Sequence, residues 1–131
     1  MTIGVDALSM TDAFEAHTIN PAAFGHEQHV RVAYDFVKRY GFVDGAARYA
    51  NCIKAISENA GHPGKYHVTV TYAFFSLIAE RMATRPAETC DRFLADNPDL
   101  LSKGVLDAWY PKEQLASDLA RRIFVLPHPA G

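Results

Sequence analysis

The segment that decides the fold is residues 25–40, GHEQHVRVAYDFVKRY. Its apolar residues recur every three or four positions, which is the spacing of one face of an α-helix. These apolar positions are Val30, Ala33, Phe36, Val37 and Tyr40. Gly41 follows directly and is a helix-stop signal, so we predict a helix over residues 25–40 whose apolar face joins the core.

Proline, glycine and capping residues divide the rest of the chain into further helices. Thr11 is expected to cap a short helix over residues 12–17. The later helices are expected over residues 44–59, 65–83, 86–94, 98–109 and 112–124. The only tryptophan, Trp109, is expected in the core. We therefore predict that residues 1–131 form one all-α domain, an irregular orthogonal bundle of about six to seven helices.

The stretch Val-Thr-Val-Thr at residues 68–71 is β-branched, and propensity alone favours a strand there. The apolar pattern nevertheless continues at helical spacing for about four turns, through Val70, Phe74, Leu77 and Ile78. We therefore predict helix, and this stretch is where β structure is the alternative.

The charge of the chain is nearly balanced, with a formal net charge of -2. That balance argues against nucleic acid or an anionic membrane as the main partner. No signal-peptide pattern is visible, and no apolar run approaches the ~20 residues of a membrane span. We therefore expect a cytoplasmic protein with no membrane partner, in which Cys52 and Cys90 stay reduced.

Three histidines in two short segments are the main chemical signal. His26 and His29 are three residues apart, so on a helix their side chains are neighbours. His67 opens another predicted helix that is apolar enough to pack against the first. Three imidazoles and a water are a usual ligand set for catalytic zinc, and imidazole also suits iron, nickel and copper. We predict a divalent metal site, with zinc favoured, at His26, His29 and His67.

Histidines that are hydrogen-bonded within the core are the alternative, because each buried imidazole needs partners for its ring nitrogens. The other three histidines, His17, His62 and His128, fall near a helix end, in a turn and in the tail. We expect these three to face solvent.

Two neighbours of the histidines are candidate catalytic groups. Glu27 is the candidate general base, and a solvated carboxylate in the first helical turn is the alternative. Tyr66 is the candidate acid, and a partly buried phenol with one hydrogen bond is the alternative. Thr69 and Thr71 either bond the carbonyl one turn back or support a ligating imidazole.

At these residues the chain resembles a family of short bacterial helical proteins of unassigned function. The shared motifs are Phe-x-His-x-x-His-Val-Arg, Lys-Tyr-His-x-Thr-x-Thr and a C-terminal Ala-Arg-x-x-Phe before a proline. Here they are Phe24, His26, His29, Val30 and Arg31, then Lys65, Tyr66, His67, Thr69 and Thr71, then Ala120, Arg121, Phe124 and Pro127. The resemblance covers most of the chain and implies a histidine-based site without a reaction. In the family the residue after the second-motif histidine is often Glu, and here it is Val68.

These features support two functions. The first is a small metal-dependent enzyme, a hydrolase or lyase, whose metal activates water or polarises a small organic substrate. The second is a non-catalytic helical protein, either ligand-binding or a subunit of an assembly, with structural histidines. The sequence leaves open whether the chain forms a homo-oligomer.

Overall fold

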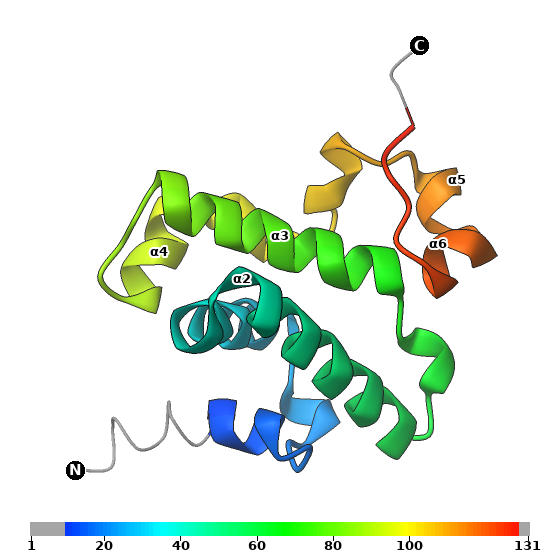
Figure 1. The fold of residues 1–131 in the computed structure, drawn as a ribbon, viewed down its shortest axis with the longest axis horizontal. Coiled ribbons are helices and arrows are strands. Elements are labelled where there is room, and N and C mark those ends of the chain that lie inside the picture. Colours follow the sequence, from blue (N-terminus) through cyan, green and yellow to red (C-terminus); the bar gives the residue numbers. More distant parts are fainter. Residues whose placement is uncertain (1–9, 129–131) are drawn as a thin grey trace.

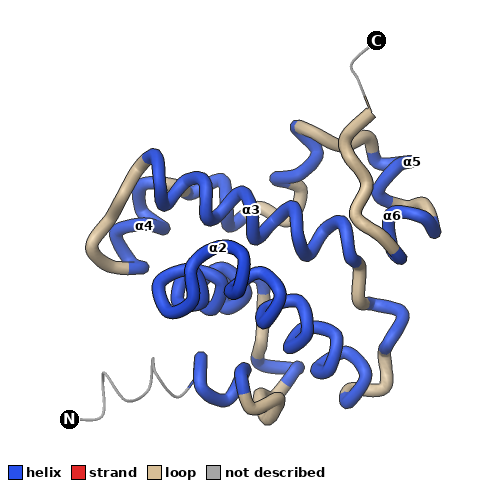
Figure 2. Tube along the Cα trace, in the orientation of Figure 1, coloured by secondary structure: helices blue, strands red, loops and turns tan. Residues whose placement is uncertain are grey.

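A computed structural model describes residues 10–128, and all regular secondary structure in that range is helical. Figure 2 shows helices joined by loops and turns, with no strand in the described part. The described part begins with helical residues 10–15 and continues through five further α-helices and four short 3-10 helices. The prediction of an all-α, irregular helical bundle is therefore confirmed.

Residues 26–40 form the first half of α2 (His26–Asn59), the longest helix of the described residues. Gly41 interrupts α2 with φ 75° and ψ -173°, a backbone conformation that essentially only glycine adopts. The two halves of α2 consequently run in different directions (Figure 1). The predicted helices over residues 25–40 and 44–59 are thus both present, and the predicted stop at Gly41 is a sharp kink.

The β-branched stretch is helical, as predicted. After the 3-10 helix η2 (Pro63–Lys65), α3 (Val68–Thr84) begins three residues later than the expected start at Lys65. The reason is that His67 is the N-cap, with extended backbone and a ring nitrogen that accepts from the Val70 N–H. Its capping and the apolar face of α3 outweigh the strand preference of residues 68–71.

The C-terminal third is more broken than the sequence predicted. A helix, α4 (Cys90–Asp96), begins after a Thr89 N-cap, and not at Pro86. The single helix expected over residues 98–109 is two 3-10 helices, η3 (Pro98–Leu101) and η4 (Val105–Ala108), separated after Ser102 turns to extended backbone.

The helix expected over residues 112–124 is likewise divided, into α5 (Lys112–Leu115) and α6 (Asp118–Arg122). Ser117 causes the division, because its side chain accepts from the Ala120 N–H and caps a new helix. Four-residue and five-residue helices have little stability of their own, so their packing against the rest of the chain holds them.

The core lies where α3 crosses α2 and where the N-terminal helix covers α2 from the other side (Figure 1). Phe14, in the N-terminal helix, is fully buried and packs edge-on against Phe36 with ring centroids 5.5 Å apart. Burial of such a side chain stabilises the fold by about 1.5–3 kcal/mol. Thr11 does not cap this helix as expected; it lies inside it and donates to Asp35 at 2.6 Å. The N-terminal helix is therefore joined to α2 by both apolar and polar contacts.

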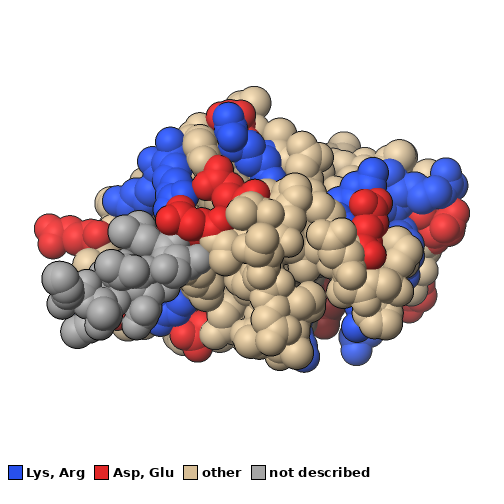
Figure 3. All heavy atoms as spheres, turned by 90° about the horizontal axis from the view of Figure 1, so that it is seen from below, with Lys and Arg blue, Asp and Glu red and all other residues tan. Residues whose placement is uncertain are grey.

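Charged side chains of both signs are interspersed on the face of the molecule seen in Figure 3. Arg39 of α2, for example, bridges to Asp12 at 3.2 Å and Glu15 at 2.9 Å. None of the helices within residues 10–128 combines the length and apolar character needed to cross a membrane.

Candidate ligand-binding pocket

A pocket of about 460 Å³ lies where α2, α3 and residues 103–106, which include the start of η4, meet. Its polar wall contains the three histidines that the sequence predicted as metal ligands. The described residues of the wall are Phe24, Gly25, His26, His29, Tyr49, Ile53, Lys65, His67, Val70, Thr71, Phe74, Lys103, Val105 and Leu106. Residues up to 82 positions apart in the sequence therefore form one concave surface.

The first turn of α2 positions two of the histidines. Gly25 begins this turn, and its N–H donates to Gln28 Oε1 at 2.9 Å, which fixes the helix start. His26 and His29 project from the same turn because residues three apart share one helix face. Both are half-buried and line the pocket.

The His26 ring is oriented by a backbone carbonyl. Its Nε2–H donates to the Leu100 carbonyl oxygen at 2.8 Å, so the neutral ring carries its proton on Nε2. Nδ1 then has a lone pair and has no hydrogen-bond partner among residues 10–128. Every fully buried side-chain nitrogen or oxygen of the described residues has a partner, so Nδ1 is within reach of solvent. An imidazole held in this way can act as a base or a metal ligand through Nδ1.

His29 is kept neutral by its surroundings. Its Nδ1 and the Tyr49 hydroxyl share a hydrogen bond at 3.3 Å, and the Phe24 ring lies 4.4 Å from the imidazole centroid. Burial, and to a smaller extent the charge of His26, lowers the pKa of His29 to about 4. Burial also raises the pKa of Tyr49 far above its usual range. At neutral pH this pair is therefore an uncharged polar contact on the pocket wall.

His67 uses both ring nitrogens for structure. Nδ1 accepts from the Val70 N–H at 3.1 Å, and Nε2–H donates to the Leu115 carbonyl oxygen at 2.7 Å. The first bond caps α3 and the second ties α3 to α5. With both nitrogens engaged, His67 has no lone pair left for a metal ion in this arrangement.

The metal geometry expected from the sequence is not formed by these side chains. Among residues 10–128, no three histidine, cysteine, aspartate or glutamate side chains converge closely enough to hold a metal ion. Zinc at His26, His29 and His67 would require ring movements, above all at His67. The metal site stays a prediction.

The two candidate catalytic groups do not line the pocket. Glu27 is exposed and bridges to Arg31 at 3.0 Å, and Arg31 also bridges to Asp91 at 2.8 Å. Tyr66 is half-buried at the end of η2, and burial raises its pKa. Their catalytic roles stay predictions.

The threonines of the second motif bond to backbone. Thr71 lines the pocket, and its hydroxyl donates to the His67 carbonyl one turn back at 2.7 Å. The Thr69 hydroxyl donates to the Ile123 carbonyl at 2.8 Å and accepts from the Val125 N–H at 3.1 Å. The C-terminal segment is thereby fastened to α3.

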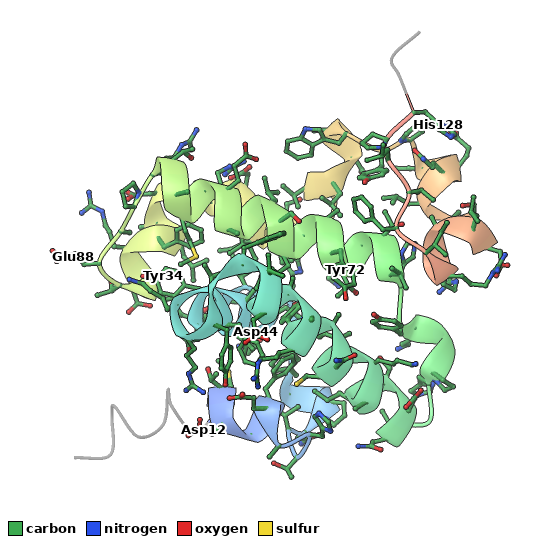
Figure 4. All side chains as sticks on the ribbon, viewed as in Figure 1. Asp12, Tyr34, Asp44, Tyr72, Glu88 and His128 are labelled. Atoms are coloured by element: carbon green, nitrogen blue, oxygen red, sulfur yellow. The ribbon has the colours of Figure 1, made fainter. Side chains whose placement is uncertain are left out.

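His17, His62 and His128 are exposed, as predicted. His128 lies at the end of the C-terminal segment, beside α5 (Figure 4). None of these three histidines lines the pocket.

Sequence reasoning missed two polar groups of the pocket. The sequence predicted no role in a site for Tyr49 or for Lys103. Tyr49 has one detectable signal, since it lies on the apolar face of its helix while carrying a hydroxyl that needs a partner. Lys103 has none, because it lies in an irregular turn that only the folded chain brings near His26.

Searches against known proteins add no family or activity to this picture. The chain matches no protein-family model, no curated protein and no solved structure.

Proposed function

We propose that this chain is a small-molecule-binding protein whose ligand occupies the pocket of His26, His29 and His67. The observation that carries the proposal is the convergence of these three histidines, from two separate helix starts, on one pocket of about 460 Å³. Small-molecule sites are typically concave, about 300–1,000 Å³ in size, largely apolar and provided with a few converging polar groups. This pocket has that composition.

The hydrogen bonds of the wall support a rigid, preformed site. His26 and His67 are each held by a backbone carbonyl, and His29 is held by Tyr49. Side chains fixed before binding lose little conformational freedom when a ligand arrives, which favours affinity.

The test is a fragment screen that observes the C–H signals of the histidine rings by NMR. Bound fragments should shift the signals of His26 and His29 and leave those of exposed His62 unchanged. Val70→Phe, which adds volume to the wall, should abolish the shifts. The matched control is Val43→Phe, because Val43 is 81% exposed and lies outside the pocket. Equal binding by Val70→Phe and wild type would refute the proposal.

A metal-dependent enzyme is the second candidate, and one specific feature favours it. His26 Nδ1 and His29 Nε2 have no hydrogen-bond partner among residues 10–128, and both rings line the same pocket. Two imidazole nitrogens one helical turn apart suit a divalent ion. His67 would complete the set only by giving up its bonds to Val70 and Leu115.

Thermal unfolding of metal-stripped protein separates this candidate from the first. If the metal site forms, zinc raises the unfolding midpoint at about pH 7.5, and the effect vanishes near about pH 5 because protons compete for the imidazoles. His26→Ala should abolish the zinc effect, whereas His62→Ala should retain it. No zinc effect at either pH would exclude the metal site and leave the ligand pocket in place.

A further inference from the structure

Among the described residues, the charged groups that line the histidine pocket all have one sign. Lys65 and Lys103 are both exposed and both line it, so each lysine belongs at once to the pocket wall and to the solvent-facing surface. No aspartate or glutamate is among the described residues of the wall. The chain as a whole carries a net charge of -2, so this local excess of positive charge is not a property of the general surface.

Neither lysine forms an ion pair with another residue of the described range 10–128. Every ion pair formed within residues 10–128 uses an arginine, and none uses Lys65 or Lys103. The N-terminus of α2 adds further positive potential. Gly25 at this helix start lines the pocket, and helix N-termini carry partial positive charge. A negative ligand group at the mouth would meet two lysines that have no ion-pair partner in the described part of the chain, and a favourable helix end.

The deeper wall is apolar and aromatic. The Phe74 ring packs on His26 with centroids 5.1 Å apart, and the Phe24 ring packs on His29 with centroids 4.4 Å apart. Ile53, Val70 and Leu106 complete this part of the surface. A flat apolar group would bury its area against these rings and aliphatic side chains.

We propose that the ligand of this pocket is a small organic anion, a carboxylate attached to a flat apolar or aromatic body. This inference rests on the proposed small-molecule function. The carboxylate lies between Lys65 and Lys103, and the body lies against Phe24 and Phe74. A carboxylate held by two ammonium groups gains charge-assisted hydrogen bonds that a neutral amide of the same shape does not.

The experiment compares three ligands of one shape and different charge: 2-naphthoate, 2-naphthamide and 2-naphthylmethylamine. Calorimetry measures each affinity at about pH 7.5, and NMR of the His26 and His29 rings reports whether binding is in the pocket. Naphthoate should bind at least about tenfold more tightly than the amide. The ratio of the affinities for naphthoate and the amide should fall in high salt, because salt screens the interaction between exposed charges.

Lysine variants test whether Lys65 and Lys103 cause the preference for the carboxylate. Lys65→Met and Lys103→Met together should remove the preference for naphthoate while retaining binding of the amide. Lys54→Met is the matched control, because Lys54 is an exposed lysine of α2 outside the pocket, and it should retain the preference. Circular dichroism checks that each variant is folded.

Failure of this inference differs from failure of the proposed function. If the amide or the amine binds as tightly as naphthoate and shifts the same histidine signals, the anion inference is wrong and the ligand pocket stands. If naphthoate keeps its preference in the double lysine variant, the assignment to Lys65 and Lys103 is wrong. If no ligand shifts the His26 and His29 signals up to millimolar concentration, both proposals are overturned.

Discussion

Replacing His29 by glutamine should make the protein less sensitive to acid. The imidazole is half-buried between Phe24 and Tyr49, and burial lowers its pKa to about 4 from the ordinary 6.5. In the unfolded chain the ring is hydrated and takes up a proton near pH 6.5. Between these two pH values the unfolded chain therefore binds more protons than the folded one, and stability is lost as the pH falls.

The size of the effect follows from the shift. One pKa unit corresponds to about 1.4 kcal/mol, so a drop from 6.5 to about 4 corresponds to about 3 kcal/mol in total. The contribution is fully present above pH 6.5 and is lost as the pH falls toward 4. Between about pH 7.5 and about pH 4.5, His29 alone should lower the free energy of unfolding by about 2.5 kcal/mol. Glutamine does not titrate, so this part of the pH dependence should disappear.

Urea unfolding followed by circular dichroism at both pH values measures the effect. The relevant quantity is the loss of stability in wild type minus the loss in His29→Gln, which cancels the contribution of carboxylates. His62→Gln is the control, because His62 is exposed and its replacement should leave the wild-type pH dependence unchanged. Equal losses in wild type and His29→Gln, within about 0.5 kcal/mol, would refute the view that a buried neutral imidazole forms the pocket wall.

Two further variants test the local structure that shapes the fold and the pocket. Gly41→Ala should lower the free energy of unfolding by about 1–3 kcal/mol, because φ is 75° at the kink of α2. Gly64→Ala is the control, because no atom lies within 4 Å of an added Cβ there, and it should leave the free energy of unfolding almost unchanged. Equal losses in the two variants would contradict a kink that depends on glycine. His67→Ala should cost about 2–3 kcal/mol, since it removes both an N-cap and the partner of the Leu115 carbonyl. His67→Asn should recover about 1 kcal/mol because asparagine is a good N-cap, and a result no better than alanine would argue against the capping role.

The helices of the first two thirds of the chain could be predicted because their signals are local. Gly41 permits a backbone that other residues avoid, and the apolar spacing on either side of it is helical over many turns. Even the β-branched residues 68–71 follow this rule, since a continuous apolar face outweighs their strand preference.

The last third was predicted less well because its helices are short. Ser102 and Ser117 look in sequence like tolerable helix-interior residues, yet each has extended backbone and interrupts an expected helix. Segments of four or five residues are held by packing and not by their own propensity, so the local pattern does not determine them. Trp109 shows the same limit: it was expected in the core but is 47% exposed, because the helix that was to bury it does not form.

The sequence by itself determined the helical class, the helix break at Gly41 and the placement of His26, His29 and His67 near two helix starts, because residue type, spacing and backbone preference are local properties. The tertiary structure decided how the rings are used. In the folded chain His26 is hydrogen-bonded to the Leu100 carbonyl and His29 to the Tyr49 hydroxyl. Both ring nitrogens of His67 are hydrogen-bonded to backbone groups. The tertiary structure also brings Lys103 to the pocket. Which carbonyl or cation lies beside a ring depends on contacts between residues up to 74 positions apart, and no local pattern encodes them.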